Sequence, residues 1–395
     1  MTVRVLIVAP TMDVRWGGPP RVVAGSAVAL ARAGCQVEVV TTGDAGEIDV
    51  LRDAWPEMAE LQIPIHVFPR GFPRMIGRSR ELREFVKSNL DRFDLLHVHA
   101  VWETGLADAA TIFREAGKPV LVSAHGMLVP GWLRRSRVKK WIARTFFGTG
   151  AMLNRADVML YGTQEEADLC SALGLAGRAE LMPNGVTPLD IADASAAREA
   201  VLEKFPVMRD WKRTVLHFSR VHHKKGLDLL VEAFARVYRD FPGAGLFIAA
   251  LEQELDYEKR VRAQIAAVGD APILFTTAMF GPSARIVFTV ADIYSLPSYD
   301  EGFSVSLVEA ASAGLPLLIT NMCHMPEVAD DGAGVVVPVT VDGLEEGLRR
   351  LLSLDDAALA EMGRRAAEIT AARYTWENVA ARLVAVYEAA VADKA

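Results

Sequence analysis

The chain has 395 residues, of which 51% are hydrophobic and 24% are charged, so it is not a disordered chain, and its length favours two α/β domains. The formal net charge of −7 argues against a dedicated nucleic-acid binder. No apolar run approaches the ~18 residues that a membrane-spanning helix needs. We therefore expect a cytoplasmic protein, with peripheral attachment to the inner face of the plasma membrane as the alternative.

The first half of the chain alternates short apolar runs with helical periods. Strands are predicted at Val3–Ala9, Val37–Thr41, Leu95–His99, Val120–Ser123 and Val158–Tyr161, and a helix at Arg21–Ala33. Continuous apolar runs that are separated by helices indicate a parallel sheet covered on both faces.

A second alternation follows a linker region, Ala192–Lys212, that also contains a helix. Its strands are predicted at Val215–Ser219, Gly245–Ala250, Ile273–Thr276, Ile293–Leu296, Leu315–Thr320 and Val335–Val337, and its helix at Leu227–Tyr238. The last helix, Trp376–Ala390, is expected to return to the first domain. The predicted domains are therefore 1–186 with 376–395, and 187–375. Two doubly wound domains leave a cleft at the carboxyl ends of their sheets, where such folds bind ligands.

The segment from Pro297 to Ala310 carries the most chemical information. A strand ends near Leu296, a loop carries Glu301 and Gly302, and a helix begins near Ser304, whose hydroxyl is expected to cap it. The free N–H groups of such a helix start favour an anionic ligand. Carboxylates at Glu301 and Glu309 suit the vicinal hydroxyls of a sugar or a ribose.

This segment resembles the GT-B glycosyltransferases of the retaining family four, because Glu301 and Glu309 fit the E-x7-E signature within Pro-Ser-x-x-Glu-Gly-Phe-Ser, followed by Ala313-Gly314-Leu315-Pro316. The resemblance implies two Rossmann-like domains facing across a cleft and extends over nearly the whole chain. It implies that Glu301 contacts the donor sugar and Glu309 the nucleotide ribose, with the donor-binding loop also containing Gly302, Phe303 and Ser304.

A second motif, Ser219 to Gly226, joins a strand to a helix through a basic loop. Arg220 can fork onto phosphate oxygens, and Lys225 supplies a mobile point charge beside them. Fixed cations here would stabilise the charge that develops on a leaving nucleoside diphosphate. The resemblance assigns both residues to the diphosphate. Ser219 stands where the family usually has glycine, and His222 and His223 are interpreted as polar loop residues.

In the first domain, Gly17 and Gly18 let a backbone approach a phosphate or sugar closely, and the family has such a loop near the donor phosphates. His125 follows a predicted strand, where the family often has a histidine that touches the transferred sugar. His97 and His99 share one strand face, as an active-site wall or as a core hydrogen-bonding pair.

The acceptor-side candidates lie in the same domain, which in this family receives the acceptor, and are His99, Trp102, Arg134 and Arg135. The basic stretch from Arg134 to Arg144 contains no acid and is flanked by Trp132, Trp141, Phe146 and Phe147. Cations beside aromatic side chains suit an anionic membrane surface. A solvated helix face and a lining for a phosphorylated acceptor are the alternatives.

We therefore predict a metal-independent, retaining glycosyltransferase without a cofactor. Its partners would be a UDP- or GDP-sugar and a hydroxyl acceptor, lipid-linked in one alternative, in polysaccharide or glycolipid assembly. No D-x-D motif is present to hold a metal, and usual glycines are missing in the Leu251–Glu254 and Phe275–Ala278 loops, which leaves the base open. The rival hypotheses are a GT-B nucleotide-sugar epimerase or hydrolase, and a catalytically idle GT-B scaffold.

Overall fold

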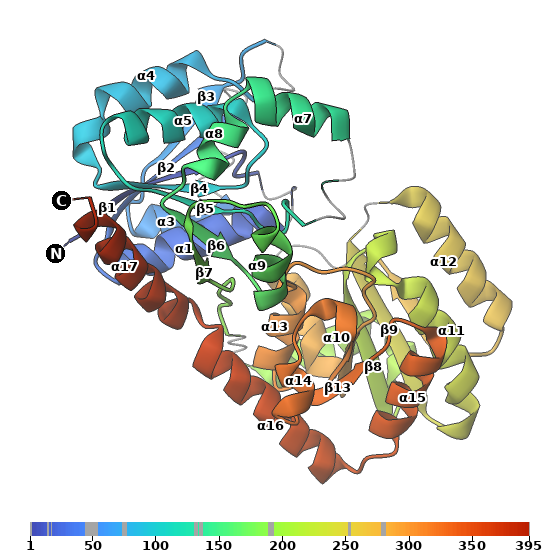
Figure 1. Ribbon diagram of the computed structural model, residues 1–395. Coiled ribbons are helices and arrows are strands. Elements are labelled where there is room, and N and C mark those ends of the chain that lie inside the picture. Colours follow the sequence, from blue (N-terminus) through green and yellow to red (C-terminus); the bar gives the residue numbers. More distant parts are fainter. Residues whose placement is uncertain are drawn as a thin grey trace. The chain divides into compact units, whose positions relative to one another are not determined.

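The computed structural model describes residues 2–13, 16, 18–43, 54–72, 77–129, 133, 137–188, 193–251, 254–277 and 282–394. The chain divides into two compact units (Figure 1). Unit 1 comprises Met1–Gly185 with Thr375–Ala395, and unit 2 comprises Val186–Tyr374. Among the described residues, no helix is both long and apolar enough to cross a membrane.

Unit 1 is built on a parallel sheet of seven described strands in the order β3-β2-β1-β4-β5-β6-β7. The strands are β1 (Arg4–Ala9), β2 (Gln36–Gly43), β3 (Ile65–Pro69), β4 (Leu95–His99), β5 (Val120–Ser123), β6 (Val158–Tyr161) and β7 (Arg178–Leu181). The helices are α1 (Gly18–Arg32), α3 (Pro56–Glu60), α4 (Arg80–Ser88), η3 (Leu90–Arg92), α5 (Thr104–Glu115), α7 (Arg137–Phe146), α8 (Thr149–Asn154), α9 (Gln164–Ser171) and α17 (Trp376–Ala392).

Unit 2 repeats this plan with six described strands in the order β10-β9-β8-β11-β12-β13. The strands are β8 (Arg213–Arg220), β9 (Ala244–Leu251), β10 (Ile273–Thr276), β11 (Ile293–Leu296), β12 (Leu317–Thr320) and β13 (Gly334–Val337). The α-helices are α10 (Ala194–Lys204), α11 (Leu227–Val237), α12 (Leu255–Val268), α13 (Val305–Ser312), α14 (Glu327–Asp330), α15 (Val341–Leu352) and α16 (Asp356–Arg373). Short 3-10 helices are η4 (Pro206–Asp210), η5 (His223–Lys225), η6 (Tyr238–Asp240), η7 (Pro282–Val290) and η8 (Asn321–Cys323).

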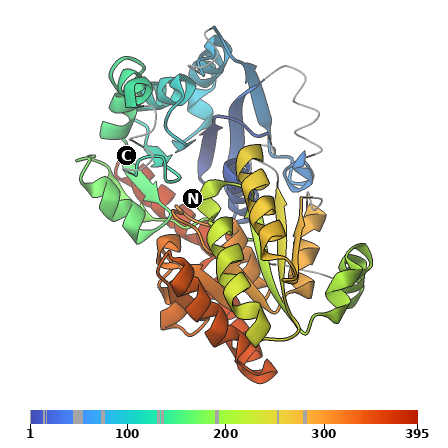
Figure 2. The same cartoon turned by 90° about the vertical axis from the view of Figure 1, so that its right-hand side faces the viewer.

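Each sheet has a hydrophobic core on both faces, with helices covering them (Figures 1 and 2). In β1, Leu6 and Val8 belong to one core, whereas Val5 and Ile7 belong to the other. Alternate side chains of a strand point to opposite faces, so a strand buried on both faces needs a continuous apolar run. This explains why apolar runs predicted the central strands.

The last helix, α17, packs in unit 1, as the sequence predicted. Tyr387 is fully buried in the core that α1 shares. At the start of α17, Trp376 packs against two glycines, Gly25 and Gly185, where a Cβ would lie 2.2 Å and 2.3 Å from its ring atoms. Only glycine admits so close an approach of the indole. Helix α17 is therefore packed closely against α1 and the sheet of unit 1.

Candidate active site

The two chemical motifs of unit 2 follow neighbouring strands. Strands β8 and β11 pair in parallel at the point where the strand order reverses. The loop after β8 carries Arg220 and Lys225, and the loop after β11 carries Glu301. Ligands of open α/β sheets bind outside the carboxyl ends of the strands at this switch point.

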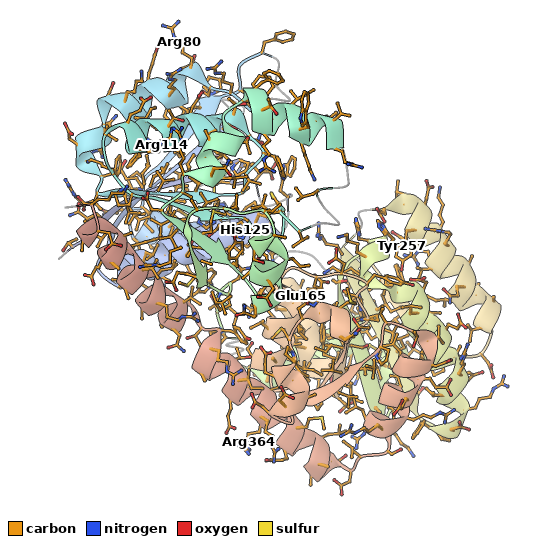
Figure 3. The ribbon with its side chains drawn as sticks, in the orientation of Figure 1. Arg80, Arg114, His125, Glu165, Tyr257 and Arg364 are labelled. Atoms are coloured by element: carbon orange, nitrogen blue, oxygen red, sulfur yellow. The ribbon has the colours of Figure 1, made fainter. Side chains whose placement is uncertain are left out.

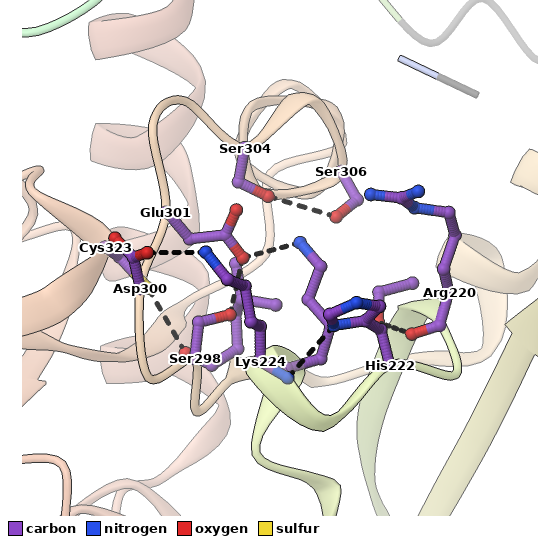
Figure 4. A network of polar contacts seen from close by, with 12 residues as sticks. Arg220, His222, Lys224, Ser298, Asp300, Glu301, Ser304, Ser306 and Cys323 are labelled. Carbon is purple, nitrogen blue, oxygen red and sulfur yellow. Dashed lines mark hydrogen bonds and ion pairs between the residues drawn. The ribbon is translucent and has the colours of Figure 1, made fainter. Parts of the chain in front are cut away.

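Lys225 and Glu301 form an ion pair between these loops (Figure 4). Lys225 Nζ lies 2.5 Å from Glu301 Oε1, and the side chains are only 12% and 9% exposed. The hydroxyl of the buried Ser298 donates to the same carboxylate oxygen at 2.5 Å. The expectation of a mobile lysine is therefore wrong, because Lys225 is held by a nearly buried carboxylate.

A second ion pair lies beside the first. Lys224 Nζ is 2.6 Å from Asp300 Oδ2, and the Tyr299 N–H donates to the Lys224 carbonyl at 2.7 Å. Gly226 follows with a positive φ of 66°, and a Cβ there would lie 2.0 Å from the Pro297 carbonyl oxygen. Glycine is required here by both the close approach and the backbone conformation. The basic and acidic loops are thus joined along their length.

Arg220 differs from Lys225 in its surroundings. Arg220 is exposed, whereas the residues of β8 from Thr214 to Ser219 are buried. Its side chain points toward the start of α13, where Ser304 and Ser306 lie (Figure 4). A guanidinium in this position is free to reach an anionic ligand.

Helix α13 places Glu309 about one turn beyond its first residue, Val305. Glu309 is 7% exposed, and its Oε1 lies 3.3 Å from Arg285 Nε, which comes from η7. Ser304 stands at the N-cap position, but its hydroxyl accepts no backbone N–H and lies 3.3 Å from Ser306 Oγ. The predicted cap is therefore wrong, because the neighbouring serine occupies the Ser304 hydroxyl.

The other residues of this loop take separate places. Gly302 is partly buried between Glu301 and Phe303. The Phe303 ring packs edge-on against Tyr374, with 5.6 Å between ring centroids. Phe303 therefore supports the loop from the core side.

Ser219 is bonded to a buried histidine in the same strand. His217 Nδ1 lies 3.0 Å from the Ser295 carbonyl and His217 Nε2 lies 2.6 Å from Ser219 Oγ. Because a carbonyl only accepts, Nδ1 carries the ring proton. The Ser219 hydroxyl also lies 3.1 Å from the Arg220 carbonyl, and it donates to the nearer acceptor, Nε2 of His217. Burial lowers the pKa of His217 to about 3, which keeps the ring neutral. Ser219 thus satisfies a core imidazole.

His222, His223 and Glu254 form a cluster with atoms within 4.8 Å of one another, as in a metal site. His223 Nδ1 lies 2.9 Å from Glu254 Oε2, and His222 Nε2 lies 3.4 Å from Oε1. The Lys224 N–H donates to His222 Nδ1 at 3.1 Å, so the ring proton of neutral His222 is on Nε2. A protonated Nε2 has no lone pair for a metal. The hydrogen bonds of the cluster therefore stabilise the basic loop.

Unit 1 holds a row of three imidazoles at the carboxyl ends of β4 and β5. His97 bonds to Tyr387 and Ser123 at 2.7 Å and 2.8 Å, and His99 Nδ1 lies 2.9 Å from His125 Nε2. Burial lowers the pKa of His97 to about 3, that of His125 to about 4, and that of His99 well below its usual range. All three rings are therefore neutral at pH 7. His125, labelled in Figure 3, is the partly exposed member.

The remaining candidates of unit 1 are scattered. Gly17, Arg134 and Arg135 lie outside the described residues. Gly18 begins α1, and a Cβ there would meet no described atom within 4 Å, so packing does not demand this glycine. His99 is buried and faces His125. The Trp102 ring lies 5.1 Å from Lys140 Nζ, and its buried N–H has no hydrogen-bond partner among the described residues.

Comparison with known proteins identifies the family. Residues 16–188 match Glycosyltransferase Family 4, and residues 203–369 match Glycosyl transferases group 1. A GDP-mannose:cellobiosyl-diphosphopolyprenol alpha-mannosyltransferase of Komagataeibacter xylinus is 30% identical over 312 residues, which cover 77% of this chain and 73% of that protein. The chain belongs to glycosyltransferase family 4.

Other relatives of this family 4 glycosyltransferase are glycosyltransferases too. A GDP-mannose-dependent alpha-(1-6)-phosphatidylinositol monomannoside mannosyltransferase of Mycobacterium tuberculosis is 27% identical over 72% of this chain and 74% of its own length. A Rickettsia africae glycosyltransferase structure matches 99% of each chain with a TM-score of 0.77 at 16% identity. Anabaena HepE in complex with UDP and glucose matches 98% of this chain and 100% of its own with a TM-score of 0.75 at 18% identity. These likenesses confirm the GT-B fold.

Some residues that contact the candidate functional residues within each unit of this family 4 glycosyltransferase were missed from the sequence. Arg285 lies in a segment without a motif, and only the fold brings it to Glu309. Glu166 is buried beside the His125 turn, in the first turn of α9, and no motif of the sequence singled it out. Ser298 stands inside the acidic motif, but nothing in its spacing showed that it contacts Glu301.

Proposed function

We propose that this chain is a retaining hexosyltransferase that moves a sugar from a nucleoside-diphosphate sugar to a hydroxyl acceptor. The observation that carries the proposal is the Lys225–Glu301 ion pair, completed by Ser298, at the switch point of unit 2. A cation and a polyol-binding carboxylate held side by side match the two ends of the bond that breaks. The diphosphate would contact the Lys225 ammonium group, and the sugar hydroxyls would contact the Glu301 carboxylate.

The transfer itself would rest on charge stabilisation. As the bond from sugar C1 to the diphosphate oxygen breaks, negative charge grows on the diphosphate, and Lys225 and Arg220 would stabilise it. The acceptor oxygen bonds to C1 from the same face, and its proton passes to the leaving diphosphate oxygen. Such a front-face step retains the anomeric configuration and needs no carboxylate nucleophile. In the free protein Glu301 acts as the counterion of Lys225, so a bound diphosphate would compete for the same ammonium group.

The donor is proposed to be GDP-mannose, with a UDP-sugar as the alternative. Two relatives carry GDP-mannose in their names, and they cover 77% and 72% of this chain. Glu309 would accept the ribose hydroxyls, with Arg285 orienting its carboxylate from 3.3 Å. The two cations of the basic loop would replace a divalent metal, so we propose that the reaction needs no metal and no cofactor.

The acceptor is proposed to be lipid-linked and to serve polysaccharide or glycolipid assembly. The names of both relatives describe acceptors that carry a lipid, a diphosphopolyprenol and a phosphatidylinositol. Unit 1 offers a matching surface in α7, a helix without a buried residue. Arg137, Trp141 and Arg144 are exposed and share one side of α7, because residues at these spacings lie on one helix face.

Helix α7 combines charge and apolar surface as a membrane-surface helix does. Val138, Trp141 and Phe146 are 70%, 60% and 68% exposed, and the rings of the last two meet edge-on at 5.8 Å. Its sequence contains no acidic residue. Each cation near an anionic bilayer contributes about 1 kcal/mol to binding, and aromatic side chains add anchoring. We therefore propose that α7 docks on an anionic membrane.

A panel of nucleotide sugars tests the function. A ligand that binds the folded state at about 100 times its Kd stabilises the protein by about 2.7 kcal/mol, so thermal shift should select GDP-mannose or one UDP-sugar. Release of the nucleotide should then require an acceptor. Donor turnover without acceptor would favour an epimerase or hydrolase instead. Failure of every nucleotide sugar to shift the melting temperature would support an idle scaffold.

A further inference from the structure

The turn that carries His125 has an unusual backbone. His125 and Gly126 have positive φ angles of 51° and 73°, and the Met127 N–H closes the turn on the Ala124 carbonyl at 3.1 Å. Ala100, which follows β4 next to it, also has a positive φ of 71°. Residues other than glycine are strained in this region, and such strain persists only where the surroundings impose it. Something must therefore hold the His125 turn.

Glu166 stabilises this turn through hydrogen bonds. It is 3% exposed and lies in the first turn of α9, where Thr163 Oγ1 accepts the Glu166 N–H at 3.1 Å. A glutamate at this position usually reaches back to the N–H of the capping residue. Here its two oxygens accept the N–H groups of Gly126 at 2.6 Å and Gly162 at 2.8 Å. A buried carboxylate is thus bonded to the amide that directly follows His125.

His99 determines which nitrogen of His125 carries the proton. Of the pair His99 Nδ1 and His125 Nε2, 2.9 Å apart, one donates and the other accepts. His99 Nε2 is buried and has no partner among the described residues. A buried N–H without a partner is rarer and costlier than an unpaired acceptor, so the His99 proton belongs on Nδ1. His99 therefore donates to Nε2 of His125, whose own proton is left on Nδ1.

We propose that Glu166 and His99 are positioning residues for His125, with Glu166 fixing the backbone turn and His99 fixing the imidazole tautomer. The inference rests on the proposed function and on the expectation, drawn from the family resemblance of the sequence, that His125 contacts the transferred sugar. Neither residue needs to touch the substrate. Their effect is to present one defined N–H of a neutral ring instead of a mixture of two.

Two-bond ¹H–¹⁵N spectra of histidine-labelled protein at pH 7.5 test the proposal without activity. Wild-type His125 should show the Nδ1–H tautomer, assigned by loss of its signals in His125→Asn. Glu166→Gln should convert it to a mixture and lower kcat/KM at least tenfold, while free GDP or UDP binds unit 2 within about twofold of wild type. Asp168→Asn removes the same charge from the exposed side of α9 and should change neither readout.

The two His99 variants give the test a second route that does not depend on Glu166→Gln folding. His99→Asn keeps a side-chain N–H donor and should preserve the tautomer and most of the activity, whereas His99→Leu should lose both. An unchanged tautomer in both Glu166→Gln and His99→Leu would overturn the inference. If wild type transfers no sugar at all, the proposed function fails, and the tautomer spectra still decide this inference by themselves.

Discussion

Lys225 Nζ and Glu301 Oε1 lie 2.5 Å apart, although 76 residues separate them in the chain. The two loops meet because β8 and β11 are neighbours in the sheet of unit 2. Each loop follows the carboxyl end of its strand, so the proposed phosphate-binding and sugar-binding residues share one edge. The ion pair shows that the two sequence motifs lie in contact in the folded unit.

Replacing either cation of the basic loop should impair catalysis more than donor binding. Lys225→Ala and Arg220→Ala should each lose about 2–4 kcal/mol of transition-state stabilisation, as for a removed oxyanion donor. Steady-state kinetics with a saturating donor measures this loss. Wild-type turnover in either variant would contradict the assignment.

The two variants should differ in stability. Lys225→Ala leaves the nearly buried Glu301 without its partner and should destabilise unit 2 by about 3–5 kcal/mol. Arg220→Ala changes an exposed residue and should lower the free energy of unfolding by less than about 0.5 kcal/mol. The double change Lys225→Met with Glu301→Gln should recover stability but not activity. Equal urea-unfolding midpoints for all three variants would show that the ion pair has no structural role.

Removing the Glu309 charge should weaken binding of the nucleotide even without a sugar. Hydrogen bonds to a charged group contribute about 1.5–3 kcal/mol. Glu309→Gln should therefore weaken the binding of free GDP or UDP, measured by calorimetry, by about 10- to 100-fold. Glu327→Gln, a partly buried glutamate in the same unit that accepts from Tyr374, is the matched control. Normal nucleotide affinity in Glu309→Gln would refute the ribose assignment.

Ser219 should be needed for the stability of unit 2. Ser219→Ala leaves the buried Nε2 of His217 without a donor and should cost about 1–3 kcal/mol of unfolding free energy. Ser353→Ala removes an exposed hydroxyl of unit 2 and should cost less than about 0.5 kcal/mol. Equal stability of the two variants would show that another group satisfies His217.

Helix α7 should bind vesicles of phosphatidylglycerol and not of phosphatidylcholine. Changing Arg137, Lys139 and Arg144 to serine should abolish co-sedimentation, as should about 0.5 M salt, since screening shortens the Debye length. The triple change of Arg239, Lys259 and Arg260 to serine in unit 2 is the control with equal charge. If both triple variants sediment like wild type, α7 serves another purpose, such as lining a groove for a phosphorylated acceptor.

The central strands of both sheets and the edge strands of unit 2, β10 and β13, could be predicted from the sequence, whereas the edge strands of unit 1 could not. The predicted strands Leu95–His99, Val120–Ser123 and Val158–Tyr161 match β4, β5 and β6 at both ends, because burial on both faces requires continuous apolar runs. The edge strands β3 and β7 were not predicted. Arg178–Leu181 is mostly exposed and half charged, so its pairing comes from β6 and not from its own side chains.

The residues proposed for the donor site could be named from the sequence, whereas the contacts that they make in the fold could not. The motifs named Arg220, Lys225, Glu301 and Glu309 because each stands at a fixed distance from a strand or helix end. The partners Ser298 and Arg285 depend on which strands and turns become neighbours, which spacing does not encode. The predicted cap at Ser304 and mobility of Lys225 were wrong for the same reason, since a tertiary neighbour occupies each side chain.

The most direct test of the account is the anomeric configuration of the product formed from GDP-mannose in EDTA. The enzyme would be supplied with octyl glycosides as acceptors, and the C1–H1 coupling of the new mannosyl unit would be measured by NMR. Because Arg220 and Lys225 are proposed to replace a metal and the attack to be front-face, we expect an α-linked product at a rate within about twofold of that without EDTA. A β-linked product, or a loss of more than about tenfold that magnesium restores, would contradict the account.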